Sequence, residues 1–130
     1  APHSQSSQNV RQILDNEAKG IFYGKVKIEQ NCPKTSAKQL SKTILLSDKA
    51  QGFSRPELDI LTDDVICNHG ATIGNIDQDA IYYLEARGFD KDQSTAILVK
   101  AFLQELISEI KNPEIYNLMH DNLNWRGDQL

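Results

Sequence analysis

The sequence is poor in cysteine, and this scarcity excludes one class of small protein. Only Cys32 and Cys67 occur among 130 residues, and they lie too far apart to form a C-x-x-C pair. Two isolated cysteines do not make the framework of a disulfide-stapled secreted domain. We therefore expect a reducing compartment, either a bacterial cytoplasm or a plastid stroma.

Long apolar runs and basic clusters are also missing. No stretch approaches the length of a membrane span, and the first residues, Ala-Pro-His-Ser-Gln, contain no signal-peptide hydrophobic region. The net charge is −4 and no Lys/Arg run is interleaved with aromatic residues, which argues against a nucleic-acid partner. The chain begins without Met in a polar stretch, as expected of an excised or processed piece of a longer protein.

Sequence motifs for catalysis are absent as well. There is no Gly-x-Ser-x-Gly nucleophile motif and no glycine loop of the kind that binds phosphate. We therefore expect a protein that is not an enzyme and does not itself hydrolyse ATP. The hydrophobic content of 39% and charged content of 25% are ordinary for a domain with a core of its own.

The first part of the chain has the patterns of β-strands. Alternation and β-branched residues predict strands at 8–14, 20–29 and 43–46, and a loop at 47–55. Residues 56–74 are predicted to form two or three short strands with a bend near 62–64. No 3.6-residue period occurs before Ile76. Such a succession suits either a sandwich or a solenoid of stacked rungs, and periodicity does not choose between them.

The second part of the chain has the patterns of helices. Asp77 predicts a cap for a helix over 78–87, with Gly88 ending it. Asp90 and Gln93 form a capping-box pattern for a helix that reaches about residue 111, and Pro113 opens a third helix. The side chains predicted to face inward are Ala80, Ile81, Leu84, Ala96, Val99, Leu103, Leu106, Ile107, Ile110, Ile115, Leu118 and Met119. The fold class is therefore α+β, with strands in 1–76 and helices in 77–130.

Cys67 and His69 are the residues most suited to metal chemistry. Strand alternation places both on the face of Val65, roughly 6–7 Å apart at their Cα atoms. A thiolate and an imidazole together suit a thiophilic metal, although two ligands do not complete a site. The alternatives remain open: Cys67 as a small hydrophobe packed in the interior, and His69 as a surface or turn histidine.

The other candidate ligands are weaker. A zinc site from Cys32, Cys67, His69 and His120 would have no recognised spacing. Asp59, Asp63 and Asp64 are better interpreted as solvated carboxylates at a turn than as an acid–base cluster.

Several segments resemble, in order, the C-terminal part of the SufB/SufD family of the SUF iron–sulfur cluster assembly system, and SufD most closely. The segment Cys67–Gly74 is similar to a SufD hallmark. The other similar segments are Ser7–Gln8 with Ile13–Leu14, Gly20–Gly24, Lys34–Gln39 with Leu45–Ser47, Pro56–Ile60, Asp63–Val65 and Tyr83–Gly88.

The resemblance implies the last rungs of a right-handed parallel β-helix followed by a small helical domain. It also implies a non-catalytic scaffold that pairs with a SufB-type subunit through the β-helix end and docks a SufC-type ATPase through its helices. A transient iron–sulfur cluster, shared with the partner rather than tightly bound, would contact His69 and Cys67.

Two other functions remain possible from the residues alone. One is a metal-binding or redox module built on Cys67 and His69, and the other is a structural β-solenoid fragment. A β-helix cut between rungs exposes backbone groups and an apolar cross-section. We therefore also expect the chain to self-associate.

Overall fold

The strands and helices of the chain occupy separate halves of the sequence. The structure, a computed structural model, describes residues 1–127 and the side chains of 1–123. Its elements are β1 (Gln5–Leu14), β2 (Lys19–Ile28), β3 (Thr35–Leu45), β4 (Gln51–Ile60), β5 (Val65–Asn75), α1 (Gln78–Glu85), α2 (Lys91–Ile107) and α3 (Pro113–Gly127). The predicted α+β order is therefore confirmed. Residues 128–130 of the predicted helical domain lie outside the described residues.

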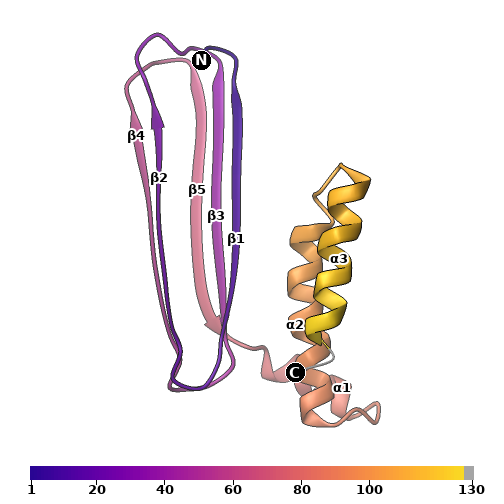
Figure 1. The fold of residues 1–130 in the computed structure, drawn as a ribbon. Helices are drawn as coiled ribbons and strands as arrows, with labels where there is room; N and C mark the ends of the chain where they lie inside the picture. Colours follow the sequence, from indigo (N-terminus) through magenta and orange to yellow (C-terminus); the bar gives the residue numbers. More distant parts are fainter. Residues whose placement is uncertain (128–130) are drawn as a thin grey trace. The chain divides into compact units, whose positions relative to one another are not determined.

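The strands form two parallel sheets, and the chain passes alternately from one to the other (Figure 1). One sheet has the order β1-β3-β5 and the other pairs β2 with β4. Each strand thus pairs in register with the strand two before it, so Gln8, Gln39 and His69 form one column. Parallel pairing of this kind excludes the antiparallel sandwich that periodicity had left open.

Two strand predictions were wrong in their extent. β3 begins at Thr35 rather than near residue 43, and β4 begins at Gln51 inside the predicted loop. The reason in β3 is that its inward positions are polar or small. The buried side chains of this strand are Thr35, Ala37, Gln39, Ser41 and Thr43. The first part of this strand therefore lacks the alternating apolar residues by which a half-buried strand is recognised in a sequence. The predicted bend near 62–64 is confirmed between β4 and β5.

The interior of the strand unit is apolar at one end and polar further along. Val26, Ile28 and Ala37 form a buried cluster at the apolar end. Further along, the Gln39 Nε2 donates to Gln8 Oε1 at 2.7 Å, and Thr43 Oγ1 donates to Gln12 Oε1 at 3.1 Å. Hydrogen bonds between stacked side chains satisfy polar groups that would otherwise be costly to bury.

Gly24 leaves the space that the Gln39 amide fills. A Cβ atom at this position would lie 2.5 Å from Gln39 Nε2 and 2.6 Å from Phe22 Cζ. No such crowding exists at Gly74 in β5, where a Cβ would meet nothing within 4 Å.

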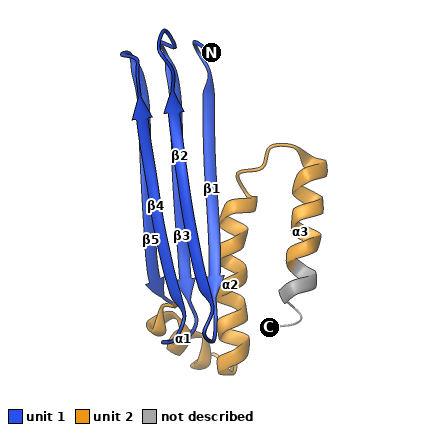
Figure 2. Ribbon diagram, turned by 60° about the vertical axis from the view of Figure 1, so that its left-hand side comes forward, with its two compact units in different colours: residues 1–75 blue, residues 76–130 orange. Residues whose placement is uncertain are grey.

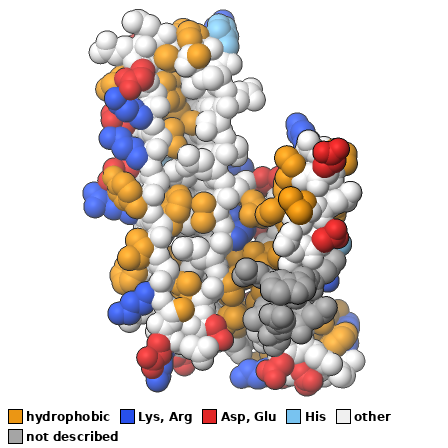
Figure 3. All heavy atoms as spheres, viewed as in Figure 1, with side chains coloured by type: hydrophobic (Ala, Val, Ile, Leu, Met, Phe, Trp, Pro, Cys, Tyr) orange, Lys and Arg blue, Asp and Glu red, His pale blue; other side chains and the backbone are white. Residues whose placement is uncertain are grey.

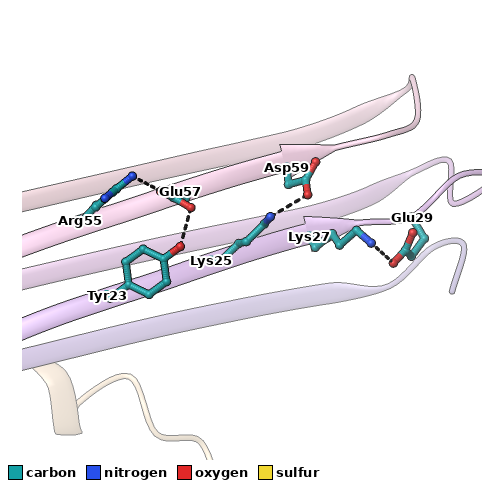
Figure 4. Close-up of polar contacts among 7 residues, drawn as sticks. All are labelled: Tyr23, Lys25, Lys27, Glu29, Arg55, Glu57 and Asp59. Carbon is teal, nitrogen blue, oxygen red and sulfur yellow. Dashed lines mark hydrogen bonds and ion pairs between the residues drawn. The ribbon is translucent and has the colours of Figure 1, made fainter.

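The outer face of β2 and β4 carries a ladder of charged side chains (Figures 3 and 4). Tyr23 Oη donates to Glu57 Oε2 at 2.7 Å, and the Arg55 guanidinium pairs with the same carboxylate at 2.9 Å. Lys25 pairs with Asp59 at 2.9 Å. The hydrogen bond from Tyr23 lowers the pKa of Glu57, and the one from Lys25 lowers the pKa of Asp59. Such diagonal contacts between neighbouring strands help to fix their register.

The helical unit begins at Ile76 and is coloured separately in Figure 2. The three predicted starts are confirmed: Asp77 caps α1, Asp90 and Gln93 form a capping box for α2, and Asn112 Oδ1 accepts from the first turn of α3. Gly88 has φ 95° just after α1, as predicted for the residue that ends it. No described helix combines the length and apolarity needed to cross a membrane.

The predicted inward face of α3 was wrong. Ile115, Leu118 and Met119 are 50%, 64% and 42% exposed. The less exposed positions are Tyr116, His120 and Leu123, at helical spacing on another side of the helix. Tyr116 explains the difference, because its ring stacks on His120 and its hydroxyl accepts from Gln104 Nε2 of α2 at 3.3 Å.

We predict that Gly24→Ala lowers the free energy of unfolding by about 1–3 kcal/mol, the usual effect of overpacking an interior. Gly74→Ala is the matched control, with no loss and a gain of up to about 1 kcal/mol from the stiffer unfolded chain. Urea unfolding of both variants measures the two effects. Equal stabilities would contradict the packing of Gly24 against Gln39.

We also predict that Tyr23→Phe raises the pKa of Glu57 towards its ordinary value, while the pKa of Asp59, held by Lys25, stays unchanged. Carboxyl NMR titration measures both. Because both folded-state pKa values are lowered, the stability that they contribute is complete above about pH 5 and is lost as the pH falls below about 4. An unaltered Glu57 titration would show that the tyrosine bond is absent in solution.

Candidate functional site

The candidate site lies on β5, which has a partner strand on only one side. β5 pairs with β3 alone among the described strands and therefore forms an edge of the β1-β3-β5 sheet. The register places Cys67 beside Ala37 and His69 beside Gln39. Since paired residues of parallel strands point to the same face, Cys67 and His69 both continue columns whose members in β3 are buried.

Cys67 is half-buried and packs against the buried cluster of Val26, Ile28 and Ala37. Val65 packs against the same cluster, so the shared face predicted for Val65 and Cys67 is confirmed, and it points inward. The thiol is free, as is that of Cys32. The packing gives Cys67 the surroundings of a small hydrophobe, and its half-buried position still leaves part of the side chain at the surface.

His69 is exposed, although the residue beside it in β3 is buried. Gln39 directly beside it is only 1% exposed, because β5 covers that position. Among residues 1–123, no hydrogen bond or ion pair involves the His69 side chain. An exposed imidazole without a competing partner is free to bind a ligand from outside the chain.

The remaining candidates do not join this pair. No three His, Cys, Asp or Glu side chains of the described residues are placed to hold one metal ion. Asp63 and Asp64 are exposed between β4 and β5, and Asp64 has φ 58°, in keeping with the predicted turn. Asp59 forms an ion pair with Lys25.

Cys67 and His69 can therefore supply at most two ligands from one face of one strand. Thiolate sulfur and imidazole nitrogen are donors suited to iron and to iron–sulfur clusters. A four-coordinate centre would need further donors from another molecule or from sulfide. The chemistry of this site thus fits a contact shared with a second protein better than a closed metal centre.

Sequence reasoning missed Gln39. Its polar side chain made the strand hard to recognise, yet it is buried at the position directly beside His69 in the register. The signal available was the alternation of Thr35, Ala37, Gln39, Ser41 and Thr43 with more exposed residues.

Two of the known proteins similar to this chain are named for iron–sulfur cluster assembly. The chain is 38% identical over 109 residues to an iron–sulfur cluster assembly SufBD family protein of Synechocystis, which covers 84% of the chain and 24% of that protein. It is 31% identical over 114 residues to the iron–sulfur cluster assembly protein SufD of Escherichia coli, covering 85% and 27%. It is 33% identical over 103 residues to the chloroplastic protein ABCI7 of Arabidopsis thaliana, covering 79% and 22%.

The chain thus spans about a quarter of the length of these curated relatives. The profile of a family described as "SUF system FeS cluster assembly, SufBD core domain" matches residues 1–102, which include all five strands, α1 and most of α2. That match takes in β3 with its buried polar column and β5 with Cys67 and His69. The chain belongs to the SufBD core-domain family of the SUF iron–sulfur cluster assembly system.

Proposed function

We propose that this chain is the C-terminal region of a SufD-like scaffold in iron–sulfur cluster assembly. Its strands, residues 1–76, would form the last coils of a right-handed parallel β-helix, and residues 77–130 a helical domain. The parallel pairing of each strand with the one two before it supports this fold. Relatives from bacteria and a chloroplast support a bacterial cytoplasm or a plastid stroma as its compartment.

The role that we propose is structural and not catalytic. The chain would hold a cluster in transit, as cargo, between itself and a SufB-type subunit, while a SufC-type ATPase would supply the ATP chemistry. The observation that carries this role is His69, which is exposed on the edge strand directly beside the buried Gln39. Cys67 would add a second donor next to it.

The pairing with a SufB-type subunit would use the open edge of β5. A strand with one neighbour presents unpaired N–H and C=O groups, which a second strand can satisfy. Ile66 and Ile73 of this strand are 70% and 42% exposed, which supports a covered state in the assembly. A second copy of the chain would use the same edge when the partner is missing, which accounts for the expected self-association.

The docking of a SufC-type ATPase would use the helical unit. Ile115, Leu118 and Met119 form an exposed apolar stripe on α3. A stripe of this spacing is the surface that an amphipathic helix offers to a partner's groove. Its exposure supports placing the ATPase on α3 rather than on the buried side of α2.

We predict that His69→Ala lowers cluster affinity in the complex with a SufB-type subunit by at least about tenfold, since loss of a ligand weakens a centre no less than loss of the ligand's hydrogen-bond partner. Absorption spectra after anaerobic addition of iron and sulfide measure the cluster. Asn68→Ala, an exposed neighbour, is the matched control.

The same experiment separates the alternative functions. A cluster or iron signal in the isolated chain, dependent on His69 and unaffected by the SufB-type subunit, would favour an independent metal or redox module. Equal cluster content in wild type and His69→Ala would overturn the proposed role of His69. No cluster under any condition would favour a structural β-solenoid.

We predict that Leu118→Asp weakens binding of a SufC-type ATPase about fivefold or more, the effect of losing a side chain worth about 1 kcal/mol of binding energy. Asn117→Asp adds the same charge next to the stripe and should bind normally. Co-purification with the ATPase measures retention, and circular dichroism checks that both variants keep their helices. Equal retention of both variants would place the docking surface elsewhere.

A further inference from the structure

Gln39 contains a buried acceptor that lacks a donor. The side chain is 1% exposed, and its Nε2 donates to Gln8 Oε1 at 2.7 Å. The other end of the amide, Oε1, is buried without a hydrogen-bond partner among the described residues. A buried carbonyl oxygen without a donor is costly, so a nearby N–H group that can reach it stabilises the fold by donating to it.

The register leaves His69 as the neighbour able to supply that donor. Gln8, Gln39 and His69 are successive members of one column, with strands about 4.8 Å apart in a sheet. Gln8 is already engaged on one side of Gln39. Gly24, which lies against the amide on the opposite sheet, has no side chain to contribute.

We propose that Gln39 is a positioning residue for His69: the two side chains are unbonded in the structure, and a rotation of the exposed imidazole would let Gln39 Oε1 accept the N–H of one ring nitrogen, which fixes the tautomer and orientation of the ring. The donation from Nε2 to Gln8 leaves Oε1 as the end of the Gln39 amide that lacks a partner. The second imidazole nitrogen then keeps its lone pair and is directed away from Gln39, towards the open side of β5.

This arrangement suits a histidine that binds metal. Metal-bound histidines usually donate their other ring N–H to a carbonyl or carboxylate, which fixes the tautomer and raises the basicity of the ligand. Gln39 would play that part from inside the strand unit, and Gly24 would keep the space for its amide. The hydrogen bond itself is independent of metal, whereas its use in holding iron rests on the proposed function of His69.

The tautomer of His69 tests the hydrogen bond directly. In the ¹⁵N-labelled chain at about pH 8.5, where imidazoles are neutral, long-range ¹H–¹⁵N NMR distinguishes a protonated ring nitrogen from an unprotonated one. We expect one dominant tautomer for His69 in the wild type. We expect the averaged shifts of a free imidazole in Gln39→Met, which keeps the length of the side chain and removes the acceptor.

Thr43→Val is the matched control, because it removes another buried hydrogen-bonding group from the same face of β3. The His69 tautomer should be unchanged in this variant. A mixture of tautomers in the wild type would overturn the proposal without any variant, so it is testable even if Gln39→Met does not fold. Identical His69 spectra in wild type and Gln39→Met would overturn it as well.

A second experiment tests whether the hydrogen bond matters for metal binding. In the complex with a SufB-type subunit, we expect Gln39→Met to weaken Fe(II) binding about 10- to 100-fold, as loss of a ligand's hydrogen-bond partner typically does. If His69→Ala leaves Fe(II) binding intact, the proposed function fails, while a fixed tautomer would still establish the bond to Gln39. If His69→Ala abolishes binding and Gln39→Met has no effect on it, the positioning role in metal binding fails alone.

Discussion

The in-register parallel pairing of every second strand is the constraint on which the strand unit depends. It stacks paired positions above one another, so a position that points to one face in one strand points to the same face in the next strand of that sheet. Columns of small and polar side chains are possible because neighbours in the column bond to each other, as Gln8 and Gln39 do. The same pairing gives β5 a buried neighbour on one side and an open edge on the other.

The proposed function depends on the position of β5 at the edge of its sheet. Inside the sheet, the position of His69 would be covered by a further strand, as Gln39 is covered by β5. At the edge, the same geometry presents an imidazole on a rigid strand. A site built on a strand holds its ligands more firmly than one built on a loop. Under the proposed function, Cys67 and His69 would be a firmly held but incomplete set of donors, which would suit a cluster that must later leave.

The sequence predicted the helices and the site strand well, because their signals are local. Asp77, Asp90 and Asn112 act on residues two or three positions away, and the alternation from Val65 to Cys67 depends on strand geometry alone. The extent of β3 and the inward face of α3 could not be predicted in this way. Gln39 can be buried because its amide donates a hydrogen bond to Gln8, 31 positions earlier in the chain. Tyr116 faces α2 because its hydroxyl accepts a hydrogen bond from Gln104.

The stacked columns also restrict how the length of the chain can change. Paired positions are 31 residues apart between β1 and β3, 32 between β2 and β4 and 30 between β3 and β5, so one complete passage through both sheets takes 30 to 32 residues. One residue inserted within a strand would turn every later inward side chain of that strand outward. The turns at 15–18, 29–34, 46–50 and 61–64 are therefore the places where insertions and deletions can accumulate over evolution without moving a column.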